Sequence, residues 1–306
     1  MLKSTLGLMK YVVILFFSLF SFIVRSDDSI TNIKNNHSIT FSYLEGEFPF
    51  SYTLAGKPTG IAIDLCKSVA EHLGKELGGK PLEIHWIKVS PAARFQSLLT
   101  HKSDVECSNI TNTSDRRQFL LFSMPYFYAS TAFISHKEDH LGSIKMLSGH
   151  TIFVTSGDIA VEAVAKLNVR LGYSLFTHLS QSAVSGFEEM KVTNNSVFVA
   201  DDVLLYSLKA ASAKPGCYNI SQDNLIAAQP FALALPRQSI TLQKAVNNAM
   251  MEMFFTNEFD KIYNKWFLSP VPPDNILINM PMPARLKQEI AKWNVQYPSL
   301  AHKKLF

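Results

Sequence analysis

Residues 106–126 have the sequence ECSNITNTSDRRQFLLFSMPY, and this stretch decides how the rest of the chain is interpreted. It places a hydroxyl side chain, Thr111, five positions before Arg116 and continues into an apolar run that ends at Phe122 and Ser123. A guanidinium is permanently charged, and its planar fork matches a carboxylate through two parallel hydrogen bonds. A free carbonyl and a hydroxyl just upstream can meet a small cation beside it. Taken alone, the stretch also fits an ordinary surface arginine.

The first 26 residues differ from the rest of the 306-residue chain. Lys3 and Lys10 precede an uncharged run of 14 residues, 11–24, and Val24-Arg25-Ser26 fits cleavage after Ser26. A bilayer span needs about 20 apolar residues, so an uncleaved anchor is the weaker alternative. We therefore expect residues 1–26 to be a signal peptide and the mature protein to be soluble and periplasmic.

The charge balance argues against a polyanionic partner. Removing Lys3, Lys10 and Arg25 from the 29 basic residues leaves 26, against 25 acidic residues. No basic stripe with interleaved aromatic residues is present in the sequence. We expect no nucleic acid as a partner.

Three cysteines allow at most one intramolecular disulfide. Cys66 lies on an apolar helical face and is expected in the core, and a Cys107–Cys217 bond is conceivable in an oxidising periplasm. The sequence contains no CxxC pair, zinc framework, HExxH, GxSxG, Walker loop or GxGxxG. We expect no metal, no cofactor and no catalytic residue.

The mature chain alternates strand and helix patterns. We expect strands over 39–43, 82–89, 126–135, 151–155 and 196–200, and helices over 60–77, 91–101, 158–168, 182–190, 203–211 and 241–255. This order predicts α/β sheets rich in parallel strands, with helices on both faces. Residues 126–135 and 229–235 are candidate crossing strands. Lobe 1 would then hold residues 27–135 plus 231–306, and lobe 2, inserted into it, residues 136–230. We expect the proline-rich tail, 269–283, to wrap lobe 1 and a short helix over 287–293 to close it.

Several local signatures follow one another along the chain. Phe48-Pro49-Phe50-Ser51-Tyr52 comes first, then Glu106-Cys107, and then residues 154–157 (VTSG), 201–205 (DDVLL) and 270–275 (PVPPDN). With the segment around Arg116, they resemble the periplasmic amino-acid-binding proteins of ABC importers (bacterial solute-binding protein family 3). The resemblance is closest to the glutamate/aspartate-binding branch. It implies a two-lobed periplasmic-binding-protein (Venus-flytrap) fold with two crossing hinge strands.

The resemblance also implies roles for individual residues. Asn109 would offer its carbonyl to a ligand's α-ammonium, Thr111 its hydroxyl to the ammonium and its N–H to the α-carboxylate, and Arg116 would clamp that carboxylate. Asp201 would be the counter-ion of the ammonium, and Arg94 matches an arginine that meets a side-chain carboxylate. The alternatives are a helix N-cap for Asp201 or Asp202, and a solvent-exposed helical arginine for Arg94.

Three departures from the branch change the expected ligand. Where the family has a hydroxyl residue after Gly157, this chain has Asp158, which could occupy the helix N-terminus itself and repel a carboxylate, although Ser156 could still donate a hydroxyl. Leu44 and Ala183 replace an arginine and a histidine of the acidic-ligand branch. We expect Leu44 and Ala183 to enlarge and dry the pocket, with Phe48 as a wall. Glu45, Glu47 and Asp158 could instead favour a cation or a hydrogen-bond donor.

The sequence therefore predicts a monomeric periplasmic solute-binding protein, not an enzyme. It would deliver a polar amino acid or related small carboxylate to an ABC permease in the inner membrane by closing its lobes around the ligand. One alternative is a cyclohexadienyl-dehydratase-like enzyme, which would need a pocket carboxylate such as Glu47 or Asp158 with a raised pKa. Another is a periplasmic sensor or docking protein that has lost amino-acid binding.

Overall fold

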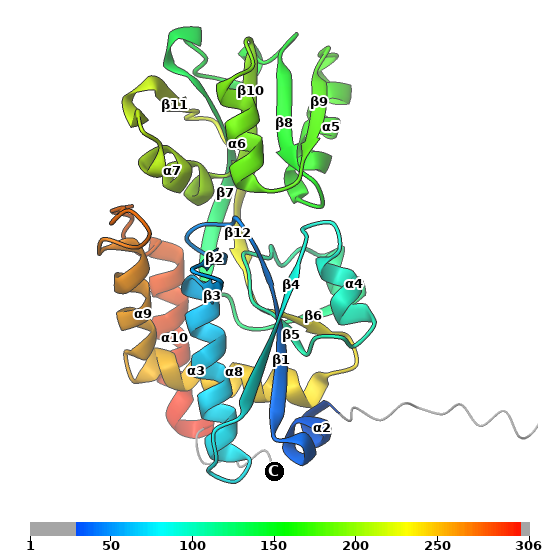
Figure 1. Ribbon diagram of the computed structural model, residues 1–306, viewed down its shortest axis with the longest axis vertical. Coiled ribbons are helices and arrows are strands. Elements are labelled where there is room, and N and C mark those ends of the chain that lie inside the picture. Colours follow the sequence, from blue (N-terminus) through cyan, green and yellow to red (C-terminus); the bar gives the residue numbers. More distant parts are fainter. Residues whose placement is uncertain (1–28, 301–306) are drawn as a thin grey trace, which may run out of the picture.

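The computed structural model describes residues 29–300, so the expected signal peptide lies outside the described part. The chain forms two lobes, one above the other in Figure 1, joined by two strands that pass between them. We call the lobe with the five-stranded sheet lobe 1 and the lobe with the six-stranded sheet lobe 2. Among the helices of residues 29–300, none combines the length and apolar character that a bilayer crossing requires.

Lobe 1 has the strand order β4-β1-β5-β13-β6. Strand β1 pairs in parallel with β4 and β5, whereas β13 runs antiparallel to β5 and β6. The bounds of its strands are β1 Ser38–Leu44, β4 Glu83–Val89, β5 Val105–Glu106, β6 Leu120–Phe122 and β13 Ala234–Pro236, beside a hairpin of β2 Tyr52–Leu54 and β3 Lys57–Thr59.

Helices cover the lobe 1 sheet because each has one apolar face. In α3 (Ile61–Glu76), Leu65, Val69 and Leu73 recur every four residues and are fully buried. The remaining helices of lobe 1 are α2 Ser29–Asn36, α4 Arg94–Leu99, the 3-10 helix η1 Arg116–Gln118, α8 Ile240–Phe255, α9 Glu258–Phe267 and α10 Ala284–Leu300.

Lobe 2 has the strand order β11-β7-β10-β8-β9, with β12 also paired to β7. Strands β8, β9 and β10 are mutually parallel, and β7, β11 and β12 are joined by antiparallel pairs. Its elements are β7 Phe127–His136, η2 Lys137–Asp139, η3 Ile144–Met146, β8 Thr151–Thr155, α5 Ile159–Leu171, β9 Phe176–Ser180, α6 Ala183–Lys191, β10 Ser196–Asp201, α7 Asp202–Ala211, η4 Pro215–Cys217, β11 Tyr218–Ile220 and β12 Ile226–Phe231.

The chain crosses between the lobes on β7 and β12, which pair with each other near Phe127 and Phe231. Because the chain enters lobe 2 on one strand and leaves on its neighbour, these two strands must be antiparallel. The segment expected as one strand over 229–235 is therefore divided between β12 and β13. The lobe limits expected from the sequence remain a prediction.

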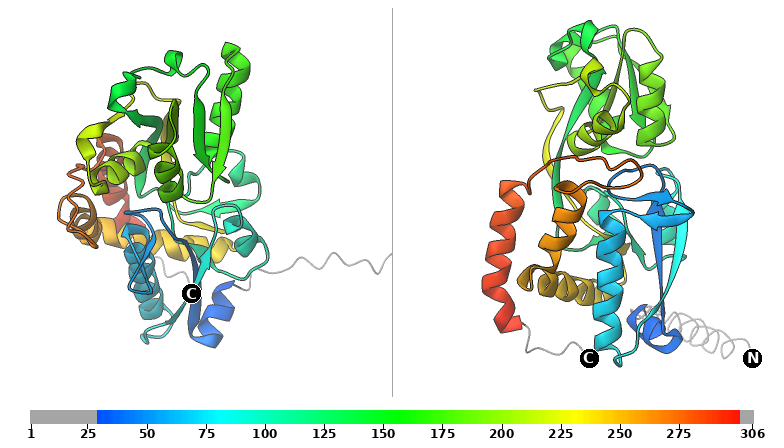
Figure 2. Two further views of the ribbon diagram at one scale, coloured as in Figure 1. Left: turned by 45° about the horizontal axis from the view of Figure 1, so that its top comes forward. Right: turned by 60° about the vertical axis from the view of Figure 1, so that its left-hand side comes forward.

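The C-terminal segment is longer and more regular than expected. Instead of a short helix over 287–293, α10 extends over Ala284–Leu300 and packs against α8 and β7 (Figure 2). Trp293 stacks on Phe254 with ring centroids 5.3 Å apart. Tyr128, in β7, donates a hydrogen bond to Glu289 at 2.7 Å. The helix thus contacts a strand that joins the lobes.

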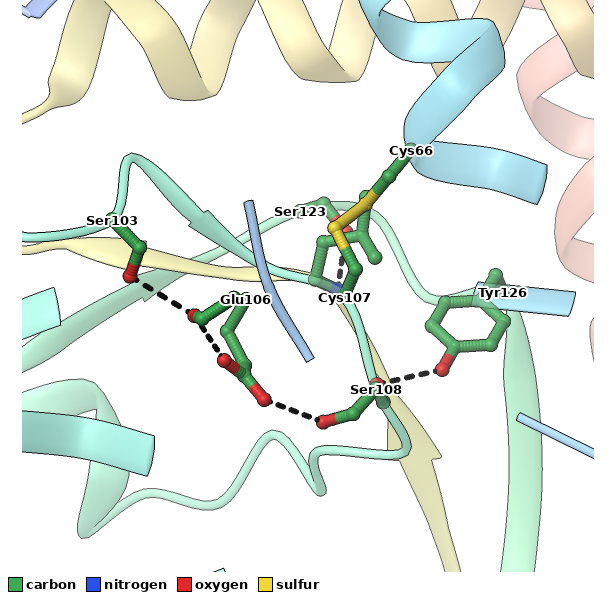
Figure 3. Close-up of a disulfide and its surroundings, with 9 residues drawn as sticks. Cys66, Ser103, Glu106, Cys107, Ser108, Ser123 and Tyr126 are labelled. Carbon is green, nitrogen blue, oxygen red and sulfur yellow. Dashed lines mark hydrogen bonds between the residues drawn. A yellow bond between two sulfur atoms is a disulfide. The ribbon is translucent and has the colours of Figure 1, made fainter. Parts of the chain in front are cut away.

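The disulfide differs from the expectation. Cys66, in α3, is buried as predicted but is bonded to Cys107 (Figure 3). Cys217 is unbonded and exposed. The apolar face of α3 lies over the loop after β5, which brings together two cysteines 41 residues apart. The pairing needs this helix-to-sheet packing, which the spacing of the cysteines does not reveal.

Candidate functional site

The predicted site residues gather where the two lobes face each other. Lobe 1 contributes the loop after β1, the first turn of α4 and the loop between β5 and η1. Lobe 2 contributes the turns after β8 and β9 and the last residue of β10. Most of these segments follow the carboxyl ends of parallel strands, the edge at which open α/β sheets bind ligands.

Arg116 is 8% exposed and belongs to lobe 1. One of its guanidinium nitrogens donates to the carbonyl of Thr111 at 3.1 Å, and another to the carbonyl of Gly157, in lobe 2, at 3.2 Å. Burial, and secondly the charge of Arg94, lower the pKa of Arg116 to about 10, and Asp158 and Asp201 oppose the shift. The side chain therefore remains a cation at neutral pH.

Arg94, at the first position of α4, is 4% exposed and also donates to the carbonyl of Gly157, at 3.2 Å. The two guanidinium carbons each lie 5.0 Å from the centroid of the Phe95 ring. Arg94 is thus not the solvent-exposed helical arginine of the alternative interpretation. Its Nε atom is buried without a hydrogen-bond partner.

Gly157, in lobe 2, approaches the backbone of lobe 1 closely. Its φ of +79° is in the left-handed region, and a Cβ there would lie 2.8 Å from the carbonyl oxygen of Pro91 in lobe 1. Both restrictions favour glycine at this position.

Asp201, the last residue of β10, is 2% exposed, and its side chain does not cap α7. The neighbouring Asp202 accepts the hydrogen bond from the N–H of Val203 at 2.7 Å. Burial first, and then the carboxylates of Asp158, Asp202 and Glu47, hold the pKa of Asp201 well above its ordinary value, against the effect of Arg116. A cation beside Asp201 would restore its charged form.

Asp158 occupies the N-terminus of α5, as the sequence suggested it could. Its Oδ1 accepts a hydrogen bond from the N–H of Ala160 at 2.9 Å. Ser156 is half-buried in the same turn and donates its backbone N–H to the carbonyl of Ser180 at 2.9 Å. The anion-binding capacity of this helix terminus is therefore partly used by the protein itself.

Sequence reasoning left Glu47 out of the predicted site, although it named this residue as a source of negative charge. Glu47 is 3% exposed and accepts hydrogen bonds from Asn109 Nδ2 and from the N–H of Ala183, both at 3.3 Å. Burial first, and then Asp158, raise the pKa of Glu47 to about 7, and Arg94 opposes this shift. The only sequence signal was an acid directly before Phe48-Pro49-Phe50.

The other predicted residues are buried nearby or in the core. Thr111 and Asn109 are 3% and 4% exposed, and Asn109 Oδ1 has no hydrogen-bond partner. Leu44 is buried at the end of β1, opposite Val89 of β4. Phe48 belongs to the main hydrophobic core and meets Tyr52 edge to face at 5.3 Å.

Grooves flank the charged cluster on two sides. One, of about 1060 Å³, is lined by Phe95, Arg116, Asp158 and the length of α5. The other, of about 850 Å³, is lined by Gly46, Lys88, Ser156 and the turn before α6. Both are lined by residues of the two lobes, and the first reaches the cluster at Arg116 and Asp158. No group of His, Cys, Asp and Glu side chains within residues 29–300 could hold a metal ion.

The sequence profile of the bacterial extracellular solute-binding proteins, family 3, matches residues 39–269. The chain belongs to this family. An L-glutamate/L-aspartate-binding protein of Pseudomonas aeruginosa is 27% identical over 272 residues, which cover 86% of this chain and 87% of the relative. The predicted resemblance to amino-acid-binding proteins is confirmed.

Solved structures of other proteins share the fold of this family 3 protein. The L-cysteine solute receptor of Neisseria gonorrhoeae matches with a TM-score of 0.68 and 23% identity, over 81% of this chain and 98% of the receptor. An ancestral amino-acid-binding protein, described as a precursor of cyclohexadienyl dehydratase, matches with a TM-score of 0.67 and 20% identity, over 78% and 99% of the two chains. The predicted two-lobed α/β fold is confirmed.

Proposed function

We propose that this family 3 protein binds an α-amino acid between its lobes and delivers it to an ABC importer. One observation carries the proposal: Arg116 of lobe 1 and Asp201 of lobe 2 are both buried in one charged cluster, and each affects the pKa of the other. A guanidinium and a carboxylate on opposite lobes match the two charges of an amino-acid head group.

The same arrangement supports a closure mechanism. The α-carboxylate would replace the Gly157 carbonyl as the partner of Arg116, with the N–H of Thr111 beside it. The α-ammonium would lie between Asp201, the carbonyl of Asn109 and the hydroxyl of Thr111. Because these groups come from both lobes, such a ligand binds the closed form better than an open one, and this difference drives closure. An ammonium beside Asp201 would also favour its carboxylate, so binding would release a proton.

Location and partners follow from this role. The proposed place is the periplasm, reached through a signal peptide in residues 1–26. The proposed partners are a polar amino acid or related small carboxylate and an inner-membrane ABC permease that recognises the closed form. We propose that the protein acts as a monomer.

Calorimetric titration of the unfolded and refolded mature protein with the twenty amino acids tests the proposal, since refolding removes any carried-over ligand. We expect Arg116→Ala to lose binding at least 100-fold, because a charge-assisted bidentate contact disappears. The matched control is Arg117→Ala, which removes an exposed arginine side chain that donates to Asn112. Normal binding by Arg116→Ala, with the control also normal, would contradict the anchor assignment.

A second candidate function is favoured by Glu47. A buried carboxyl with a pKa of about 7 beside Arg94 has the protonation that a general acid needs near neutral pH. Such a group would suit a dehydratase that eliminates water from a small carboxylate. The test is to incubate wild-type protein and Glu47→Gln with prephenate and to measure how much prephenate remains. A dehydratase that uses Glu47 would consume prephenate as wild type and lose this activity in Glu47→Gln, whereas a binding protein would consume none.

A further inference from the structure

The charged cluster of the cleft holds two arginines, and the acids on which each arginine acts form two sets, which Asp158 and the repulsion between the arginines link. Arg116 acts on Asp201 and is itself influenced by Asp158 and Asp201. Arg94 acts on Glu47 and Glu106, where its charge opposes the rise in pKa that burial causes. If Arg116 and Asp201 bind the ligand head group, as proposed above, the set around Arg94 is left for the ligand side chain.

Glu47 already provides a carboxylate in that second set. It is held by the amide of Asn109 from lobe 1 and by the first N–H of α6 from lobe 2. Ser182 and Ser185 cap the N-terminus of α6 reciprocally and satisfy two of its backbone N–H groups. The donors that would stabilise an incoming anion at this end of the cleft are therefore used by Glu47, which would also repel such an anion.

Two buried polar atoms in the same set have no partner. Arg94 Nε is a hydrogen-bond donor, and Asn109 Oδ1 is an acceptor, because Nδ2 of the same amide faces Glu47. Buried polar groups in native proteins are nearly always paired. A neutral ligand group that carries both an acceptor and a donor would satisfy the two atoms, and a carboxamide has both.

We propose that Glu47 takes the place of an acidic ligand side chain, as a built-in counter-ion of Arg94. The cleft then selects an α-amino acid with a carboxamide side chain over the acidic amino acid of the same length. This inference rests on the proposed amino-acid-binding function and adds its ligand class.

Titration of the refolded mature protein at pH 8 with L-glutamine, L-glutamate, L-asparagine and L-aspartate tests it. We expect the wild type to bind one amide at least about 100-fold more tightly than the matching acid, the loss that accompanies an unpaired buried charge. In Glu47→Gln, the ratio is expected to fall below about tenfold, because the acid gains affinity. The matched control is Glu45→Gln, on the same loop, where the glutamate is half-exposed and paired with Lys88 at the rim.

The outcomes distinguish this inference from the proposed function. If wild-type protein binds glutamate or aspartate as tightly as the amide, or prefers lysine or arginine, the inference is wrong and the binding function stands. An unchanged ratio in a folded Glu47→Gln protein also overturns it. If no amino acid binds the wild type, both fail together. The wild-type ratio needs no variant, so misfolding of Glu47→Gln would not remove the test.

Discussion

Glu47 and Glu106 are both buried acids of lobe 1, and the pKa of each is raised to about 7, chiefly by burial. Their partners differ. Ser42 and Ser108, both in lobe 1, donate to Glu106, whereas Glu47 needs the N–H of Ala183 from lobe 2 (Figure 3 shows the surroundings of Glu106). The burial of Glu106 is therefore a property of one folded lobe. The burial of Glu47 also depends on the contact between the two lobes.

The largest expected effect comes from removing the disulfide next to Glu106. Replacing Cys66 and Cys107 by serine should lower the free energy of unfolding by about 4 kcal/mol, because a loop of 41 residues is no longer closed in the unfolded chain. Denaturant unfolding measures this loss. Cys217→Ser is the control and should change nothing, since this thiol is exposed and unbonded. A loss equal to that of the control would show that lobe 1 does not depend on the bond.

The next effect concerns Glu106 itself. Its pKa is about 7 in the folded protein and 4.5 as the ordinary value, so the folded state holds the proton more tightly. The resulting stabilisation is complete below pH 4.5 and is lost as the pH rises through 7, by about 3 kcal/mol. In Glu106→Gln, this loss should be absent from the free energy of unfolding measured between pH 4.5 and 8.

The control for Glu106 is Glu83→Gln, which replaces an exposed glutamate of the same sheet. It should keep the wild-type dependence on pH. If Glu106→Gln also keeps the wild-type pH dependence of the free energy of unfolding, another acid is responsible for it. Glu106 could then no longer be contrasted with Glu47 as an acid that titrates within one lobe.

The smallest effect is on the contact between the lobes. Glu47 is surrounded by Asp158, Arg94 and the amide of Asn109. Deprotonation of Glu47 therefore leaves a carboxylate anion in a buried site that already holds the charge of Asp158. Raising the pH from 5 to 8.5 without ligand should therefore reduce the ratio of closed to open protein by at least tenfold, about 1.4 kcal/mol. Small-angle X-ray scattering should record a larger radius of gyration at the higher pH, and Glu47→Gln should remove the difference. Identical radii at both pH values would mean that Glu47 titrates without moving the lobes.

The sequence was sufficient for local elements, whereas the residues proposed to hold the head group remain a prediction. Strand β8 has the predicted bounds, 151–155, and α3 differs by one residue at each end. Periodicity determines such elements, because one apolar face must be buried. Of the two adjacent aspartates, Asp201 is at the N-cap position of α7 without a side-chain capping bond, and Asp202 accepts from the N–H of Val203.

What the sequence could not reveal depends on packing between distant segments. Glu47 and Ala183 are separated by 136 positions, and they meet through the packing of lobe 2 against lobe 1. Cys66 looked like an ordinary core residue because its burial was predictable and its partner was not. Similarly, the sequence predicted only a short helix after the proline-rich tail, whereas contacts of Leu286 and Trp293 with lobe 1 accompany the full length of α10.

The exposed thiol of Cys217 has a practical consequence for measuring these motions. The other two cysteines are bonded to each other and fully buried, so a thiol-reactive dye should attach to the natural protein at one place in lobe 2. A second dye at an exposed position of lobe 1, such as Lys67→Cys, would complete a pair for energy-transfer measurements. The natural protein thus provides one of the two labelling sites, and single-molecule energy transfer would report the distance between the lobes as ligand is added or the pH is changed.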